Sequence, residues 1–461
     1  MQGNDSIHNR PTPVLPAILS PRIEENVFSI NLSAQMHATL FRVNHNNTYP
    51  NLVESFDVSK DQLKYTFTLK KIKFHNGVDL TSGHVKRSLE SVIAVRSPGF
   101  ARFNNVLGYE DFLKGGDGLK GITIVDDRVF SVQLLKPTPD LLVTLSDLRN
   151  VNLFDENKPS IGAGPFKLVQ NSQSEILLEN VSQASNQVKF LRYYQRDMPK
   201  AIADFNSEKA DDLFLYPMGI DELKGIHAAH ITTTNPPRTY VFVINSNFSK
   251  EERAWIYERL PSYKQLNKCY PDGLPAFSLA PKGRMGYLKS EEVGKSENKI
   301  KAPSGSLNVS ISLGVGKEDC VKATIESSLA EVAQLSVSVN KGTRMVEKWA
   351  KNMYDIAFFY IEFDNIIDEY QFFTAESAYN FGVKKEDGFT QNVVSYYDEQ
   401  DELKRNDLAK KLNQDILSYK TLKPVFYPKQ HLVYSKKYDK VSFSERQDAD
   451  MSVSSLKLKK G

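Results

Sequence analysis

The region from residue 302 to residue 361 constrains the fold most, because it alternates strand-like and helix-like runs in a fixed order. LNVSISL, SVSVNKG and DIAFFYI have the apolar or alternating character of strands, whereas DCVKATIESSLAEVAQL and RMVEKWAKNM have helical composition. Helices that alternate with strands usually form right-handed crossovers between parallel neighbours. This order therefore predicts a βαβ-type lobe in the second half of the chain.

The first third of the chain instead predicts antiparallel hairpins. Residues 62–74 alternate apolar and polar side chains, which is the period of a half-buried strand, and Asn76-Gly77 supplies a tight turn. A helix is expected over residues 84–95, where Val85, Leu89 and Ile93 share one face. Further elements are expected in the order strand pair 121–135, strand pair 165–180, strand 238–245, helix 249–260, helix 399–419 and extended return 422–434.

Length and charge argue against several classes of protein. With 461 residues, the chain is too long for one ordinary core and predicts two or three domains. A balance of 59 Lys and Arg against 56 Asp and Glu argues against a nucleic-acid or membrane-surface partner. No apolar run reaches the roughly 18 residues that a membrane span needs. No signal segment opens the chain, whose polar start resembles a mature or trimmed N-terminus.

The two cysteines, Cys269 and Cys320, leave two interpretations open. Both fall in the same expected lobe, so they can form a disulfide with each other or remain as two buried thiols. Such low cysteine usage fits a protein that relies on its core, rather than on many cross-links, for stability.

No catalytic or metal-binding motif stands out. The GxGxxG match at Gly116, Gly118 and Gly121 precedes a strand-like run rather than a helix, so it predicts a loop and not a phosphate cradle. The eight histidines are scattered without HExxH spacing, and no GxSxG elbow is present. We therefore expect a non-enzymatic protein with no metal and no cofactor.

An acidic group follows the run DIAFFYI and consists of Glu362, Asp364, Asp368 and Glu369. One interpretation is a solvated loop. The other is a ligand site, because carboxylates at the end of a strand can receive the ammonium group of a ligand. The residues alone leave both interpretations open.

Six motifs resemble, in order, those of family 5 of the bacterial solute-binding proteins, the oligopeptide-, dipeptide- and nickel-binding components of ABC importers. The first motif is YPNLVESFDVSKDQLKYTFTLKKIKFHNGVDLTSGHVKRSLESV, at 49–92. The others are GITIVDDRVFSVQLLKPTP, IGAGPFKL, TYVFVIN, YDIAFFYIEFD and DLAKKLNQDILSYKTLKPVFYP. Each motif is weak alone, but the series covers nearly the whole chain at the family's spacing.

The resemblance implies an α/β, type II periplasmic-binding-protein-like fold, with two lobes around a cleft and an extra domain inserted in the first lobe. Lobe I would be discontinuous and comprise 1–44, 161–245 and 432–461, the extra domain 45–160, and lobe II 246–431. Hinge closure of the lobes would trap the ligand. The implied function is extracytoplasmic capture of short peptides, by a monomer that serves the membrane subunits of an ABC transporter.

The matching positions also imply a peptide site. In peptide-binding members of the family, the Asp at the end of the YD strand pairs with the terminal ammonium of the ligand, and the matching residue here is Asp364. A desolvated ammonium needs such a carboxylate. Backbone groups just before it would pair with an extended peptide, and a segment of lobe I would face them. The backbone groups are those of Tyr360, Ile361 and Glu362. The facing segment of lobe I consists of Asn26, Val27 and Phe28.

Departures from the family pattern leave the class of ligand open. Ile361 stands where the family has Trp, DNIIDEY lacks the Asp-Pro pair, and GAGPF stands for GTGPY. The alternatives are a non-peptide ligand, such as a nickel chelate or a sugar, and a sensor or scaffold with a degenerate pocket. In each case the expected location is the periplasm or the outer face of the cytoplasmic membrane, with a lipid anchor as one option.

Overall fold

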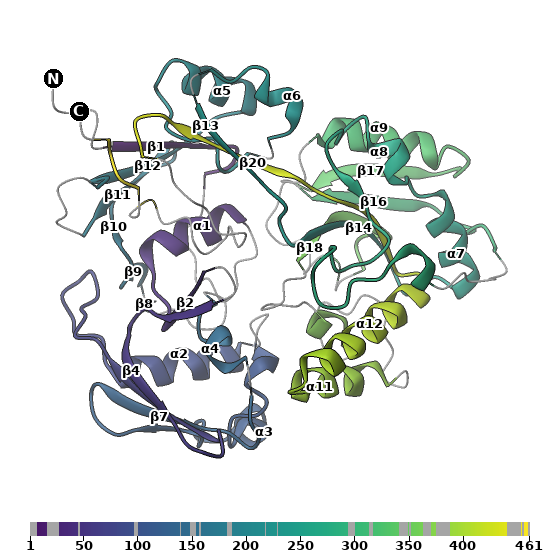
Figure 1. The fold of residues 1–461 in the computed structure, drawn as a ribbon. Helices are drawn as coiled ribbons and strands as arrows, with labels where there is room; N and C mark the ends of the chain where they lie inside the picture. Colours follow the sequence, from purple (N-terminus) through teal and green to yellow (C-terminus); the bar gives the residue numbers. More distant parts are fainter. Residues whose placement is uncertain are drawn as a thin grey trace. The chain divides into compact units, whose positions relative to one another are not determined.

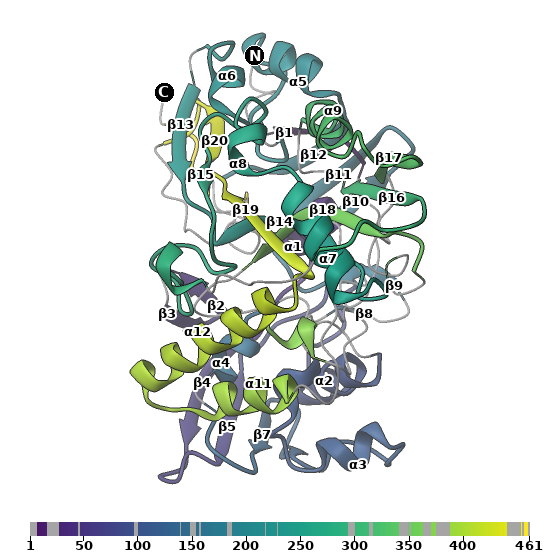
Figure 2. The ribbon, with the colours of Figure 1, turned by 90° about the vertical axis from the view of Figure 1, so that its right-hand side faces the viewer.

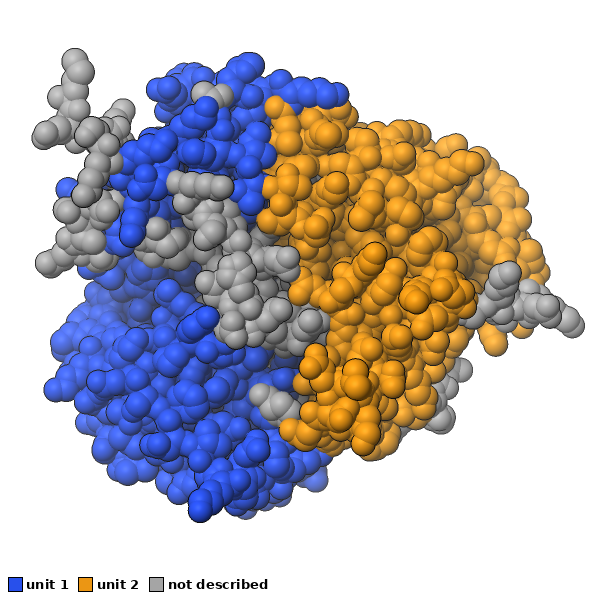
Figure 3. All heavy atoms as spheres, in the orientation of Figure 1, with its two compact units in different colours: residues 1–216, 224–232, 432–461 blue, residues 217–223, 233–431 orange. Residues whose placement is uncertain are grey.

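The computed structural model describes residues 7–15, 27–44, 47–95, 100–138, 140–147, 154–155, 158–181, 187–216, 218–227, 229–293, 300–312, 317–340, 349, 352–362, 370–374, 388–439, 453 and 456–459. Contacts divide the chain into two units (Figure 3). Unit 1 comprises residues 1–216, 224–232 and 432–461, and unit 2 comprises residues 217–223 and 233–431. Residues 233–245, expected in lobe I, belong to unit 2 by these contacts, and the three-part division stays a prediction.

One four-stranded sheet of unit 1 joins the N-terminal strand to three strands from the middle of the chain. Its order is β1 (Ile7–Thr12), β12 (Phe190–Gln195), β11 (Glu175–Asn180) and β10 (Phe166–Asn171). β1 pairs with β12 in parallel, and the other neighbours are antiparallel. Helix α1 (Val27–Met36) packs on this sheet, because Phe28, Leu32 and Met36 recur every four residues and form one buried face.

The second four-stranded sheet of unit 1 contains predicted hairpins. Its order is β4 (Val53–Val58), β5 (Lys64–Leu69), β7 (Val129–Gln133) and β6 (Ile122–Ile124), and all neighbours are antiparallel. Helix α2 (Ser82–Ala94) follows its N-cap Thr81 and buries Val85, Leu89 and Ile93 in the core of this sheet. The strands and the helix expected from the alternation are therefore confirmed.

Shorter elements complete unit 1. They are β2 (Phe41–Asn44), β3 (Asn47–Pro50), η1 (Phe100–Phe103), α3 (Tyr109–Leu113), α4 (Leu141–Thr144), β8 (Phe154–Asp155), β9 (Lys158–Gly162) and α5 (Met198–Asn206). The glycines of the GxGxxG match lie before strand β6, so the predicted loop is confirmed. Gly162 lies so close to the end of α1 that a Cβ atom there would overlap the carbonyl oxygen of Met36.

Unit 2 is built on one six-stranded sheet. Its order is β15 (Leu274–Pro275), β19 (Leu422–Tyr427), β14 (Arg238–Ile244), β18 (Ile356–Glu362), β16 (Leu307–Ser312) and β17 (Leu335–Asn340). β16 runs parallel to both β17 and β18, which confirms the predicted βαβ arrangement. The helix expected over RMVEKWAKNM lies outside the described residues, except for Trp349 and the last two positions.

Helices cover both faces of this sheet. They are α7 (Lys250–Arg259), α8 (Tyr263–Leu266), α9 (Glu318–Ser328), α11 (Phe389–Asp398) and α12 (Glu402–Ser418), with short turns η2 (Ser290–Glu292) and η3 (Tyr370–Phe373). Phe242 and Phe358 share the core of α7, α8 and α9, whereas Val243 and Ile361 share that of α11 and α12. Alternate residues of a strand point to opposite faces. Helices α11 and α12 lie side by side in both views (Figures 1 and 2).

Two paired strands carry the chain between the units. The boundary falls at residues 232–233 within β13 (Ala229–Thr234) and at residues 431–432 within β20 (Gln430–Ser435). A short helix, α6 (Ile220–Leu223), belongs to unit 2, although the stretches before and after it in the sequence belong to unit 1.

Candidate functional site

The end of strand β18 holds the described part of the predicted peptide site. Its pairs with β14 run from Ile356 to Glu362, whereas its pairs with β16 run only from Ile356 to Phe358. Glu362, the first member of the acidic group, is the last residue of β18, and the other members follow it in the chain. Asp364, like Asp368 and Glu369, lies outside the described residues, so its predicted contact with a ligand ammonium stays a prediction.

Tyr360 and Ile361 face opposite sides of the sheet, so they can serve a ligand only in different ways. Ile361 is 4% exposed and packs in the core beneath α11 and α12. Its side chain is therefore committed to packing, and its backbone alone could pair with a ligand. Tyr360 is half-buried on the other face, where the guanidinium of Arg238 lies 4.6 Å from its ring centroid. A cation over the ring is attracted to its face, so this contact favours the observed orientation of Tyr360.

Aromatic rings form a continuous support behind Tyr360. The ring of Tyr240 lies 5.7 Å from that of Tyr360 and stacks on Phe426 at 4.5 Å. Tyr270 lies 4.5 Å from Phe426 on the same side of the sheet. Burial raises the pKa of Tyr270 well above its usual value, so its hydroxyl stays neutral. The sequence pattern predicted the strands but not this ring cluster, because its members lie far apart in the chain.

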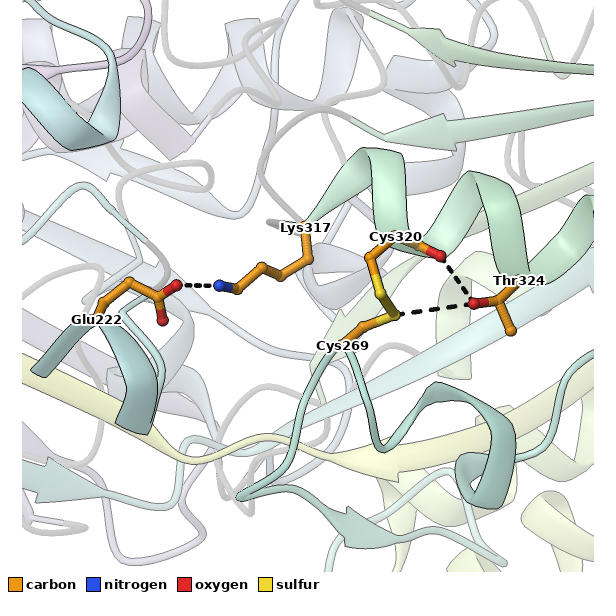
Figure 4. Close-up of a disulfide and its surroundings, with 5 residues drawn as sticks. All are labelled: Glu222, Cys269, Lys317, Cys320 and Thr324. Carbon is orange, nitrogen blue, oxygen red and sulfur yellow. Dashed lines mark hydrogen bonds and ion pairs between the residues drawn. A yellow bond between two sulfur atoms is a disulfide. The ribbon is translucent and has the colours of Figure 1, made fainter. Parts of the chain in front are cut away.

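A disulfide holds the segment that carries Tyr270. Cys269, which precedes Tyr270, is bonded to Cys320 in the first turn of α9, with a Cα–Cα distance of 5.8 Å (Figure 4). The hydroxyl of Thr324 donates to the carbonyl oxygen of Cys320 at 2.7 Å. Of the two interpretations that the sequence left open for the cysteines, the structure supports the disulfide.

The segment of unit 1 expected to face the ligand is described only in part. Asn26 lies outside the described residues, and Val27 is the first residue of α1, with no described side chain. Phe28 is 3% exposed and packs in the core of the first sheet. Its side chain therefore stabilises unit 1, and the predicted role of this segment toward a ligand stays a prediction.

Sequence reasoning missed a buried polar network in unit 1. One carboxylate oxygen of Asp212, Oδ2, accepts hydrogen bonds from Arg10 Nε at 2.8 Å and from Arg10 Nη2 at 2.7 Å. It also lies 2.6 Å from Nε2 of His8, whose Nδ1 lies 2.8 Å from the hydroxyl of Tyr438. The network joins β1 to segments about 200 and 430 residues away, so no local spacing could reveal it.

Electrostatics explain why this network tolerates burial. Burial alone would raise the pKa of Asp212, but the positive charge of Arg10 and the hydrogen bonds from Arg10 and His8 outweigh it and hold that pKa well below its usual value. Arg10 in turn donates from Nη1 to Asn31 Oδ1 at 3.0 Å. The network therefore stabilises unit 1.

The residues that the structure describes also bear on metal sites and on membrane-spanning helices. Among these residues, no group of three or more His, Cys, Asp or Glu side chains could hold a metal ion. None of the helices in these parts of the chain is both long and apolar enough to cross a membrane.

Comparison with known proteins connects this fold to a family. The model of the bacterial extracellular solute-binding proteins, family 5 (middle region), matches residues 47–260. The dipeptide-binding protein DppE of Bacillus subtilis is 30% identical over 142 residues, 26% of this chain and 25% of that protein. A dipeptide-binding protein of Lactococcus lactis is 32% identical over 143 residues, 30% of this chain and 26% of that protein. The matches thus span about a quarter of each curated relative.

Solved structures share the fold over almost the whole chain. OppA of Haemophilus influenzae, in complex with the peptide RPPGFSPFR, has a TM-score of 0.83 at 14% identity, covering 99% of this chain and 100% of that one. AgaA of A. tumefaciens R10, in complex with agropinic acid, has a TM-score of 0.80 at 16% identity, covering 99% of both chains. At such identities the likeness shows the fold alone, and it confirms the predicted fold class.

The family match lies across the predicted hairpins of unit 1 and ends at residue 260, just beyond helix α7 of unit 2. The fold match extends over the rest of the chain. The findings together are a match to the family 5 model over residues 47–260 and a fold shared with solved solute-binding proteins over almost the whole chain.

Proposed function

We propose that this protein captures short peptides outside the cytoplasm and passes them to the membrane subunits of an ABC importer. The observation that carries the proposal is the fold that it shares, over 99% of its length, with an oligopeptide-binding protein in complex with a peptide. Two matched relatives are dipeptide-binding proteins, which supports the same class of ligand.

The proposed site uses backbone and charge rather than shaped side-chain pockets. An extended peptide lies along Tyr360, Ile361 and Glu362 and hydrogen-bonds to their backbone groups. This main-chain pairing does not depend on the side chains of the peptide. Asp364 neutralises the terminal ammonium of the peptide. The buried side chain of Ile361 supports this mode, because that residue has only its backbone to offer.

The remaining features of the proposal concern organisation and location. Two lobes close around the ligand by a hinge, with an extra domain at 45–160, and Asn26 to Phe28 contribute from lobe I. The protein acts as a monomer without enzymatic turnover. It works in the periplasm or at the outer face of the cytoplasmic membrane, where a disulfide such as Cys269–Cys320 persists.

Isothermal titration calorimetry tests this proposal. Pools of di- to pentapeptides should bind, and N-terminally acetylated versions of the same pools should bind at least about tenfold more weakly, because acetylation removes the ammonium. Asp364→Asn should weaken binding of the free-amine pools by a similar factor. Asp368→Asn, four residues away on the same segment, is the matched control and should bind as the wild type does. Equal binding of acetylated and free peptides would remove the proposed role of Asp364.

A second candidate is a non-peptide solute. It is favoured by the TM-score of 0.80 to AgaA in complex with agropinic acid, nearly the same likeness as to the peptide complex. The same calorimetry with agropinic acid separates the two candidates. Binding of agropinic acid, with no response to any peptide pool, would favour the second candidate over the first.

A further inference from the structure

The end of β18 is held by a neighbouring strand on one edge only, among the residues that the structure describes. β14 pairs with β18 from Ile356 to Glu362, whereas β16, on the other edge, pairs with it only from Ile356 to Phe358. The backbone from Phe359 to Glu362 therefore depends on β14 and on side-chain packing for its position. Under the proposed function the peptide lies along this stretch, so the groups that pack against it bear on binding.

Four aromatic rings, here called the ring chain, lead from Tyr360 to Tyr270. The centroids of successive rings are 5.7 Å apart from Tyr360 to Tyr240, 4.5 Å from Tyr240 to Phe426 and 4.5 Å from Phe426 to Tyr270. Tyr270 also lies 5.6 Å from Tyr240. Aromatic rings at such separations attract one another. Because a protein interior is close-packed, a shift of Tyr270 is passed on through the two middle rings to Tyr360.

The loop between α8 and β15 carries Tyr270 and is anchored beside that residue. Cys269, the preceding residue, is bonded to Cys320 of α9 (Figure 4). The hydroxyl of Tyr263 in α8 lies 3.0 Å from the carbonyl oxygen of Tyr270 and 2.6 Å from that of Gly273. A covalent bond and a hydroxyl thus restrain the backbone from which the ring of Tyr270 projects.

We propose that Tyr270 is a positioning residue for the peptide site, which acts on Tyr360 through Phe426 and Tyr240. The disulfide supplies the fixed base from which Tyr270 acts. The ring chain and the disulfide both belong to unit 2, so the effect arises within that unit. The inference rests on the proposed function for its effect on peptides, whereas the effect on Tyr360 exists without a ligand.

The first measurement follows Tyr360 in ligand-free protein. The whole protein is produced with 3-fluorotyrosine, and the fluorine NMR signal of Tyr360 is the one that Tyr360→Phe removes. Tyr270→Leu should shift or broaden this signal, because it removes the last ring of the chain. Cys269→Ser with Cys320→Ser should do the same, because it frees the loop that carries Tyr270. Tryptophan fluorescence checks that unit 2 of each variant is folded.

Three further variants separate positioning from general destabilisation. Tyr270→Phe keeps the ring and should leave the signal of Tyr360 at its wild-type position. Tyr263→Phe removes only the hydroxyl that restrains the loop, and it should shift the signal in the same direction by a smaller amount. Tyr257→Leu is the matched control, because Tyr257 packs on the same core but lies in α7, with the ammonium of Lys420 4.4 Å from its ring centroid. It should leave the signal unchanged.

Calorimetry with the di- to pentapeptide pools then measures the consequence for binding. Tyr270→Leu and the double cysteine variant should bind the pools about threefold to tenfold more weakly than the wild type, whereas Tyr270→Phe and Tyr257→Leu should bind as the wild type does. The positioning role is overturned if Tyr270→Leu leaves the signal of Tyr360 unchanged, if Tyr257→Leu moves it as much, or if the signal moves without any loss of affinity. If the wild type binds no peptide, the proposed function fails, and the fluorine signal alone decides whether Tyr270 positions Tyr360.

Discussion

Replacing Asp212 by asparagine should destabilise unit 1 by about 3–5 kcal/mol, because it leaves a buried charge without its partner. Arg10 is 1% exposed and Asp212 is 3% exposed, so water cannot replace the lost carboxylate. One oxygen of the wild-type carboxylate, Oδ2, accepts two hydrogen bonds from Arg10 and contacts His8, and asparagine offers these cations no negative charge. Asp79→Asn is the matched control, since it breaks an exposed Lys73–Asp79 pair and should change stability by less than about 1 kcal/mol.

Urea unfolding, followed by two probes, locates the effect. Both tryptophans, Trp255 and Trp349, lie in unit 2, so tryptophan fluorescence reports on that unit alone. Far-UV circular dichroism reports on both units. Asp212→Asn should move part of the dichroism transition to lower urea and leave the fluorescence transition nearly unchanged.

The stabilisation by Asp212 should also depend on pH in a definite direction. Its pKa is held below that of an unfolded chain, so the stabilisation is complete above the unfolded value of about 3.9 and is lost as the pH falls toward the lower folded pKa. The difference between wild type and Asp212→Asn should therefore shrink below about pH 4.

The double variant Arg10→Met with Asp212→Leu checks the reasoning. Removing both charges should be less harmful than removing Asp212 alone, because no unpaired charge remains in the core. If Asp212→Asn behaves like Asp79→Asn, or if the double variant loses as much as two independent substitutions would, the assignment of a buried ionic network is refuted.

Two further predictions concern cross-links and close packing. Cys269→Ser with Cys320→Ser should destabilise unit 2 by up to about 4 kcal/mol, since the disulfide closes a loop with a sequence separation of 51. This would be contradicted if the tryptophan-fluorescence transition in urea stayed unchanged both in the double variant and in the wild type treated with reductant. Gly162→Ala should destabilise unit 1 by about 1–3 kcal/mol, because the added methyl group overlaps the Met36 carbonyl. Gly305→Ala, which meets no atom within 4 Å, is its control and should unfold at the wild-type urea concentration by circular dichroism.

Periodic segments of the sequence were the most predictable part of the fold. The alternation of residues 62–74 and the spacing of Val85, Leu89 and Ile93 correspond to β5 and α2, because each pattern carries its own period. The strand–helix order after residue 302 predicted the parallel pairs of β16 with β17 and β18. These are local signals that a single sequence contains.

Long-range polar and aromatic contacts could not be predicted in the same way. The hydrogen bond between His8 and Tyr438 joins residues that are 430 positions apart in the sequence. The stack of Tyr240 on Phe426 joins neighbouring strands that lie near the start and the end of the sequence of unit 2. Nothing in the spacing of these residues distinguishes them from other buried side chains. The pairing of Cys269 with Cys320 was one of two open interpretations, because a pair of cysteines in one lobe fixes neither their distance nor their orientation.

Mass spectrometry of the ligand that co-purifies with the protein tests peptide capture most directly. The protein is purified without denaturation, and its bound ligand is then released and identified. The proposal predicts a family of released masses that tandem fragmentation reads as short peptides with free amino ends. A single non-peptide mass, bound at one equivalent and absent after Asp364→Asn, would contradict it.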